Sequence, residues 1–123
     1  FTRFGYGDDR FETLFFDLNT EWLVATSGSL ALGFIVFERS GRHAEIFGLA
    51  VDRQSRRNRL GDALVTCCLK RLRGQGVRRV WFHTQPDNLP AQLLFEYHGF
   101  SSQGVDGYYP SGAQAIRYEW SAS

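Results

Sequence analysis

Apolar and polar positions divide the chain into a first half of strands and a second half in which helices and strands alternate. In the first half, short runs rich in Val, Ile and aromatic residues are separated by turns that contain glycine and serine, which is typical of antiparallel strands. These predicted strands are residues 21–28, 30–41 and 43–51. Ahead of them, residues 8–19 carry apolar side chains at three- and four-residue steps, which predicts a short amphipathic helix.

The second half begins with a longer helix. From residue 57 to residue 73 apolar side chains recur at four-residue steps, which predicts a helix with one apolar stripe. A second helix is predicted over residues 88–100, because Pro90 suits the first turn of a helix and Gly99 suits its exit. Three further strands are predicted over residues 77–84, 100–109 and 114–121. This order predicts one layered α/β (α+β) domain over residues 1–123.

The composition is that of a globular protein, with 43% hydrophobic and 22% charged residues. The longest apolar run, residues 30–37, is far shorter than the roughly 20 residues needed to cross a bilayer, and no signal-peptide pattern is present. We therefore expect a cytoplasmic protein, whose N-terminal element is incomplete because the chain begins at Phe1. The adjacent Cys67 and Cys68 cannot form an ordinary disulfide, and no spacing of cysteines and histidines predicts a metal site.

Positive charge is concentrated in one stretch. The formal net charge is only +1, yet nine of the 14 Lys and Arg residues lie from Arg53 to Arg79, where Asp62 is the sole acid. Such a stretch suits a phosphorylated small molecule or nucleic acid, although a solvated helix face has the same composition. No nucleic-acid-binding motif accompanies the charge, so nucleic acid is the remotest of these alternatives.

The segment from residue 48 to residue 65 has the architecture of a phosphate-binding site. A strand runs through a basic loop into the predicted helix, and free N–H groups at a helix N-terminus can hold a pyrophosphate. Here the sequence resembles the GNAT superfamily of acyl-CoA N-acyltransferases, whose hallmark is Q/R-x-x-G-x-G/A between such a strand and helix. Residues 56–61 fill this motif, with Arg59 in place of the first glycine.

Two further blocks strengthen the resemblance. Residues 83–100 are similar to the family segment N-x-x-A-x-x-L-Y-x-x-x-G-F, which is matched at Asn88, Ala91, Leu94, Gly99 and Phe100. The run GYYPSGAQAI, residues 107–116, is similar to the last hairpin of ribosomal-protein N-terminal alanine acetyltransferases. The blocks follow the family order and together cover about residues 21–121.

The resemblance implies a mixed, largely antiparallel sheet that is splayed at the cofactor site, with helices on both faces and acetyl-CoA as the acyl donor. The end of the strand before the loop would hold the pantetheine arm, and the amides at the start of the helix would hold the pyrophosphate. Asn88 would contact the CoA arm, with a helix cap as its structural alternative. The implied cofactor-binding residues are Leu49, Ala50, Val51, Arg56, Arg57, Asn58, Arg59, Leu60, Gly61, Asp62, Asn88 and Phe95.

The resemblance offers two candidates for the general base. Glu45 lies at the position of the catalytic glutamate of the superfamily's histone acetyltransferases, and His83 lies where N-terminal acetyltransferases carry a Glu or His base. A neutral imidazole can accept a proton near pH 7 without the large rise in pKa that a carboxylate needs, so we prefer His83. A paired strand carboxylate and an ordinary strand histidine are the alternatives.

The usual general acid of the family is missing, because its tyrosine position is Phe95 in this chain. The departing thiolate must then be protonated by another group or by water, or leave unprotonated. Tyr108 and Tyr109 are the candidates for this role. In the N-terminal acetyltransferases such tyrosines line the peptide entrance, and exposed hairpin aromatics are a further alternative.

We therefore expect an acetyl-CoA-dependent N-acetyltransferase that acts on a primary amine. A peptide N-terminus is slightly preferred to a small-molecule amine as the acceptor, and neither a nucleic acid nor a membrane is expected as a partner. A CoA-binding domain with little catalysis is the main alternative, because Phe95 and Arg59 depart from the family pattern. The acceptor and the oligomeric state, for which a homodimer is one option, are not determined by the sequence.

Overall fold

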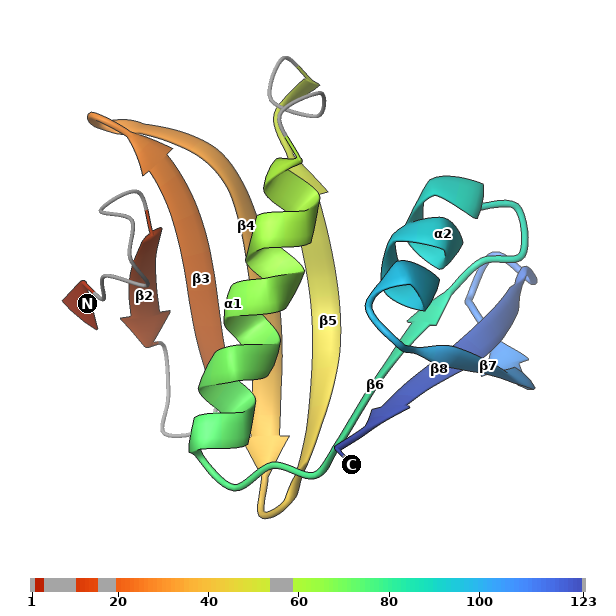
Figure 1. Cartoon of the computed structure of the whole chain (residues 1–123). Coiled ribbons are helices and arrows are strands. Elements are labelled where there is room, and N and C mark those ends of the chain that lie inside the picture. The colour runs from red at the N-terminus through yellow and green to blue at the C-terminus, as the bar shows by residue number, and fades with distance from the viewer. Residues whose placement is uncertain (1, 4–10, 16–19, 54–58, 123) are drawn as a thin grey trace.

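The computed structural model describes residues 2–3, 11–15, 20–53 and 59–122, and it arranges them as one sheet with two helices (Figure 1). The strands are β1 (Thr2–Arg3), β2 (Phe11–Phe15), β3 (Thr20–Ser27), β4 (Leu30–Ser40), β5 (His43–Val51), β6 (Arg79–Thr84), β7 (Ser101–Tyr108) and β8 (Gln114–Ser121). The helices are α1 (Leu60–Gly74) and α2 (Leu89–Tyr97). Among the helices of these residues, none is long and apolar enough to span a bilayer.

The sheet is mixed and largely antiparallel, as predicted. Its strand order is β1-β2-β3-β4-β5-β6-β8-β7. Every neighbouring pair is antiparallel except β5 and β6, which run parallel because α1 carries the chain from the end of one to the start of the other. The predicted fold class is therefore confirmed. The helix that connects the two parallel strands β5 and β6 is α1.

The sheet opens between β5 and β6. Their pairing ends with Ile46 opposite Phe82, although β5 continues to Val51 and β6 continues to Thr84. Beyond this last pair the two strands diverge, as Figure 1 shows. The splay expected from the family resemblance is therefore present. It divides the sheet into one part with β1 to β5 and another with β6 to β8, which are joined by the pairs from His43–Arg79 to Ile46–Phe82.

A β-bulge lies at the point where the sheet opens. In the pairing of β4 with β5, Val36 lies opposite Gly48 whereas Phe37 lies opposite Ile46, which leaves Phe47 as an extra residue in β5. A bulge of this kind bends its strand and increases the local twist. The bend directly follows the last β5–β6 pair, so it turns the end of β5 away from β6.

Both helices lie on the same face of the sheet (Figure 1). Their buried side chains form one cluster with inward-facing residues of β3 to β6 and β8. The ring of Phe95 in α2, for example, lies 3.8 Å from that of Phe82 in β6. The expectation of helices on both faces is not met in the described residues, because the segment predicted to supply another helix contains a strand.

That segment is β2, which replaces part of the helix predicted over residues 8–19. It pairs antiparallel with β3, from Phe11 opposite Ala25 to Phe15 opposite Glu21. The apolar spacing fits a helix, but an isolated helix of about 12 residues is marginal in water, whereas the edge of β3 supplies backbone hydrogen-bond partners. The prediction is therefore wrong for residues 11–15, and the rest of the predicted helix lies outside the described residues.

The predicted apolar stripe of α1 is confirmed. Leu60, Leu64 and Leu72 are buried against the sheet, together with Cys68. Both cysteines are buried and unbridged, as expected. Burial raises the pKa of the Cys68 thiol, which therefore stays protonated and packs as a small apolar group.

A buried carboxylate ties β3 to the last turns of α1. Glu21 is only 6% exposed. Its carboxylate forms an ion pair with the guanidinium of Arg71, and its Oε1 accepts a hydrogen bond of 3.1 Å from Nε2 of Gln75. This contact joins the sheet to the end of α1 by a charged pair in addition to the apolar packing of the core.

We expect Glu21→Ala to lower the free energy of unfolding by about 3 kcal/mol, because it deletes a buried charge that binds two α1 side chains. Urea unfolding followed by tryptophan fluorescence measures this loss. The control is Glu38→Ala, which removes an exposed carboxylate from β4 and should cost less than about 1 kcal/mol. Equal losses in the two variants would show that the buried pair adds nothing to stability.

Candidate active site

The opening between β5 and β6 contains a cavity of about 200 Å³, here called the splay cavity. Its walls come from the bulged end of β5, the end of β6 and the first two turns of α2. The lining residues are Ile46, Phe47, Gly48, Leu49, Phe82, His83, Thr84, Asn88, Ala91 and Phe95.

The end of β5 offers backbone groups to this cavity. Its pairing with β4 continues as far as Val51, but on the side of β6 no strand partner follows Ile46 among the described residues. Backbone N–H and C=O groups that lack a strand partner can bind an extended ligand with amide groups. Of the three residues predicted to hold the pantetheine arm, Leu49 lines the splay cavity, whereas Ala50 and Val51 line a separate hollow beside β3 and β4.

The N-terminus of α1 begins at a residue with an unusual backbone. Arg59 has φ 56° and ψ 31°, and it is the one non-glycine residue of positive φ among the described residues. Glycine adopts this conformation readily, whereas other residues incur a cost of about 1–2 kcal/mol. This explains the family's glycine at the position that Arg59 fills.

The first N–H groups of α1 belong to Leu60, Gly61 and Asp62, and such groups have no acceptor within their own helix. The side chain of Arg59 makes no capping bond to them. These amides are therefore suited to an anionic group, as predicted. The remaining motif residues lie outside the described part of the chain and are Arg56, Arg57 and Asn58.

The first turn of α1 is packed closely against α2. A Cβ atom at Gly61 would lie 3.4 Å from Cδ2 of Leu94 and 4.0 Å from Cγ2 of Val51. One residue further, Oδ1 of Asp62 lies 3.0 Å from Nε2 of His98 at the end of α2. Nothing in the spacing of residues predicts the pairing of Asp62 with His98. Both contacts fix the helix N-terminus relative to the splay cavity.

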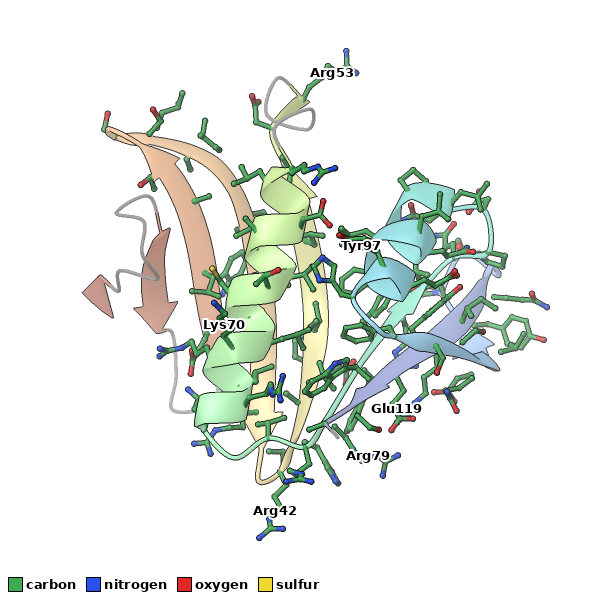
Figure 2. All side chains as sticks on the ribbon, in the orientation of Figure 1. Arg42, Arg53, Lys70, Arg79, Tyr97 and Glu119 are labelled. Carbon is green, nitrogen blue, oxygen red and sulfur yellow. The ribbon has the colours of Figure 1, made fainter. Side chains whose placement is uncertain are left out.

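The basic stretch of the sequence does not form one patch. Arg53 lies near the start of α1, whereas Arg79 lies near the opposite end (Figure 2). Arg79 donates a hydrogen bond of 2.6 Å to Glu119. A helix of 15 residues is about 22 Å long, so the arginines at its two ends cannot bind one phosphate group together. Of the described arginines, Arg53 and Arg59 are the ones near the predicted phosphate site.

Asn88 caps α2 and lines the splay cavity. Its Oδ1 accepts a hydrogen bond of 3.3 Å from the N–H of Ala91, which confirms the helix-cap interpretation. Phe95 is 2% exposed and packs edge-on against Phe100 as well as on Phe82. It therefore forms an apolar wall of the cavity at the position where the family places its proton donor.

The two candidates for the general base are neighbours on the face of the sheet opposite α1 and α2. Nδ1 of His83 lies 3.9 Å from Oε2 of Glu45, whose Oε1 accepts a hydrogen bond of 3.1 Å from the indole of Trp81. Nε2 of His83 lies 2.8 Å from Oδ2 of Asp106 in β7. His83 thus follows the buried Phe82 and, by the alternation of a strand, points to the opposite face.

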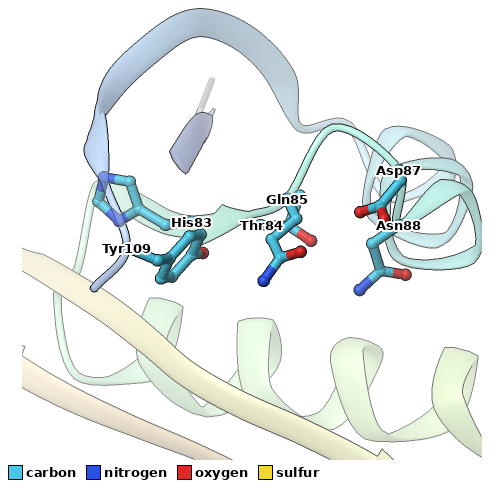
Figure 3. A pocket seen from close by; sticks show the side chains of 6 residues that line it. All are labelled: His83, Thr84, Gln85, Asp87, Asn88 and Tyr109. Carbon is cyan, nitrogen blue, oxygen red and sulfur yellow. The ribbon is translucent and has the colours of Figure 1, made fainter. Parts of the chain in front are cut away.

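His83 lies where three cavities meet. It lines the splay cavity, a cavity of about 370 Å³ beside the β7–β8 hairpin, and one of about 570 Å³ at the start of α2. The second, here called the hairpin cavity, is lined by Glu45, Ile46, Phe47, His83, Asp106, Gly107, Tyr108, Tyr109 and Ala115. Figure 3 shows the third, with His83 and Tyr109 at one end and Asp87 and Asn88 at the other. A ligand in the splay cavity and one in the hairpin cavity would both reach the imidazole.

The two hairpin tyrosines differ in exposure. Tyr108 is 70% exposed, whereas Tyr109 is partly buried beside His83. Burial raises the pKa of Tyr109 above its ordinary value, so its hydroxyl keeps its proton at neutral pH. Both tyrosines line the hairpin cavity, and Tyr109 is the better placed proton donor of the two.

Comparison with known proteins identifies the family. The model of the "Acetyltransferase (GNAT) family" matches residues 2–100. The chain belongs to this family. This agrees with the resemblance seen in the three sequence blocks, and the splay between β5 and β6 corresponds to a feature expected from it.

The names of two curated relatives of this GNAT chain state different acceptors. A mycothiol acetyltransferase of Brachybacterium faecium is 33% identical over 91 residues, which are 70% of this chain and 28% of that protein. The ribosomal protein bS18 alanine N-acetyltransferase of Escherichia coli is 33% identical over 69 residues, which are 55% of this chain and 47% of that protein. The chain thus spans about a third of the length of the mycothiol acetyltransferases that it matches.

Solved structures share the GNAT fold of the chain. The crystal structure of the same Escherichia coli alanine N-acetyltransferase superposes with a TM-score of 0.78 at 23% identity, covering 87% of this chain and 72% of that one. PaiA N-acetyltransferase of Thermoplasma acidophilum, solved in complex with coenzyme A, gives a TM-score of 0.74 at 19% identity, covering 85% and 62%. These likenesses are evidence for the fold.

Sequence reasoning missed Asp106, Arg117 and Trp81, which surround His83 and Glu45 in the folded chain. They come from three strands, and only the register of β6, β7 and β8 brings them together. No spacing in the sequence distinguishes Asp106 from an ordinary turn aspartate. Within the described residues, no group of three His, Cys, Asp or Glu side chains is placed to hold a metal ion.

We expect Gly61→Glu to abolish the rise in melting temperature that acetyl-CoA causes. The substitution puts a bulky anion at the helix N-terminus, where a pyrophosphate would need the backbone amides. Thermal unfolding with and without millimolar acetyl-CoA measures the shift. The control is Thr66→Glu, an exposed position further along α1, which should keep the wild-type shift. An unchanged shift in Gly61→Glu would place the phosphate site elsewhere.

Proposed function

We propose that the chain transfers an acetyl group from acetyl-CoA to a primary amine. The observation that carries the proposal is the position of His83, which lines both the splay cavity and the hairpin cavity. Acyl transfer needs a donor and an acceptor that meet at one proton-accepting group. The two cavities supply two separate approaches to the same imidazole.

The donor half of the proposal is supported by the fit of the residues to CoA. The pantetheine arm would lie in the splay cavity beside Leu49, with its amides bonded to backbone groups of β5 beyond its last pair with β6, and would continue past Ala50 and Val51 toward the start of α1. The pyrophosphate would lie on the amides at the start of α1, beside the exposed Arg59. The apolar wall formed by Phe95 would face the thioester end.

In the acceptor half, the amine would enter through the hairpin cavity. His83 would take a proton from the amine nitrogen, which then attacks the thioester carbonyl carbon. The new C–N bond replaces the C–S bond, and the thiolate of CoA leaves. The imidazolium of His83 would then protonate the thiolate, directly or through water or the Tyr109 hydroxyl, which keeps its proton at neutral pH.

The preferred acceptor class is the α-amine of a peptide N-terminus, and a small-molecule amine is the second. The YYP hairpin and the similarity to an alanine N-acetyltransferase support the peptide. The similarity to mycothiol acetyltransferases supports the small molecule. A CoA-binding role with little catalysis is favoured by one observation, the buried Phe95 at the position of the family's acid.

We expect His83→Gln to lower turnover by about 10²-fold or more with little change in acetyl-CoA binding, because it removes the proton acceptor and keeps some hydrogen bonding. Thiol release from acetyl-CoA, measured against a panel of amines and peptides, gives the rate. Glu45→Gln is the comparison and should cost less.

Two results would count against this assignment. If the wild type binds acetyl-CoA but releases no thiol with any acceptor, the CoA-binding role is the better description. If His83→Gln turns over normally and Glu45→Gln is inactive, the carboxylate is the base.

A further inference from the structure

His83 lies between two carboxylates, one near each ring nitrogen. Nε2 is 2.8 Å from Oδ2 of Asp106, which is a hydrogen-bond distance. Nδ1 is 3.9 Å from Oε2 of Glu45, which is too far for a direct bond. The two nitrogens are therefore not equivalent, because one is paired and the other faces a gap.

Asp106 is held as a hydrogen-bond acceptor. The hydrogen bond with His83 holds the pKa of Asp106 below its ordinary value, and the charges of His83 and Arg117 act in the same direction. Nη1 of Arg117 lies 3.7 Å from Oδ2 of Asp106, and its guanidinium lies 4.6 Å from the centre of the Trp81 ring. An ionised carboxylate has no hydrogen to donate, so Nε2 must carry the hydrogen of a neutral imidazole.

Glu45 lies on the other side of the His83 ring, near Nδ1. Trp81 binds its Oε1 and so leaves Oε2 directed toward Nδ1 of His83. Hydrogen bonds from nitrogen are about 2.9 Å long, so a single nitrogen atom can bond to both Oε2 and Nδ1 across a separation of 3.9 Å. A primary ammonium group that lies beside this pair of atoms has the hydrogens to donate to both and a charge opposite to that of Glu45.

We propose that Asp106 is a positioning residue that fixes His83 as its Nε2–H tautomer, and that the acceptor binds as an ammonium ion between His83 Nδ1 and Glu45 Oε2. The inference rests on the proposed function, whose acceptor half it specifies. Glu45 then determines specificity for charged amines, and His83 remains the base.

The proton balance of this arrangement closes. The ammonium ion gives one proton to Nδ1 of His83 and becomes a neutral amine, whose nitrogen forms the bond to the acetyl carbon. The C–S bond breaks with its electron pair on sulfur. The second proton that the nitrogen loses goes to the solvent, and the imidazolium returns its own proton to the thiolate directly or through water. While it is charged, the imidazolium lies between two carboxylates, Asp106 and Glu45.

The geometry selects a class of acceptor. Aliphatic primary amines, including most peptide α-amines with a pKa of about 8, are largely charged at pH 7. They gain the attraction of Glu45 before they lose a proton to His83. Aromatic amines are neutral at this pH and gain no such attraction, so we infer that they are poor acceptors.

The tautomer is tested directly by ¹⁵N NMR of the full chain labelled at histidine. The chain has three histidines, and the spectrum of His83→Gln identifies the signals of His83. For the neutral imidazole of the wild type, we expect Nε2 to show the chemical shift of a protonated nitrogen and Nδ1 that of an unprotonated one. In Asp106→Asn the amide can donate to Nε2, so the Nδ1–H form should increase.

Kinetics with an aliphatic amine provide the second readout. Asp106→Asn should lower kcat/KM by about tenfold or more, because the carboxylate no longer holds the ring in its Nε2–H tautomer. Asp106→Glu should recover part of the rate. Asp87→Asn removes the same charge from the far end of the cavity in Figure 3 and should lower the rate less. Glu45→Gln should raise KM for the amine more than it lowers kcat.

The outcomes separate the inference from the proposed function. The role of Asp106 would be overturned if the wild type carried the Nδ1–H tautomer. It would also be overturned if the wild type were active and Asp106→Asn had the same tautomer and the same rate. A KM for the amine that Glu45→Gln leaves unchanged would overturn the ammonium site. Thiol release from no acceptor in the wild type would overturn the proposed function instead, and the NMR result would still decide the tautomer.

Discussion

The bulge at Phe47 is the local irregularity on which the candidate site depends. It inserts one residue into β5 directly after the last pair with β6, so the two parallel strands separate where they would otherwise exchange hydrogen bonds. Gly48 permits this geometry, since a Cβ atom there would lie 3.3 Å from Cγ1 of Val36. The separation exposes the backbone of β5 on one side and leaves the end of β6 reachable from both faces.

The alternation of β6 then assigns different chemistry to the two faces. Phe82 points toward the helices, where it packs with Phe95, Phe100 and Tyr118 and closes the inner wall of the splay cavity. His83, the next residue, points to the opposite face, where Glu45 and Asp106 lie. In the proposed reaction the donor is held mainly by backbone and apolar groups, and proton transfer is confined to the charged side of the same strand.

Sequence periodicity predicted the elements that rest on local pattern. The strands from Glu21 onward and the apolar stripe of α1 were found within a few residues, because α1 and all of these strands except the exposed β7 bury one face against the core. β2 was missed, since its pairing with the edge of β3 is not encoded in its own spacing. Glu45 and His83 were identified as alternatives, but their proximity depends on the parallel register of β5 and β6. Asp106 depends in addition on a β7–β8 pairing that is interrupted twice.

The absence of a tyrosine at Phe95 is consistent with a single residue handling the proton in both directions. A hydroxyl at this position would need a partner in a wall made of aromatic rings, and Phe95 is 2% exposed there. His83 becomes charged when it accepts the proton of the amine, so the imidazolium is itself an acid beside the cavity in which the thiolate forms. A thiolate with a pKa near that of a cysteine is a good leaving group and needs only late protonation. Phenylalanine at position 95 therefore removes one proton donor, but the reaction still has an acid. His83 can fill this role because it lines both the splay cavity and the hairpin cavity.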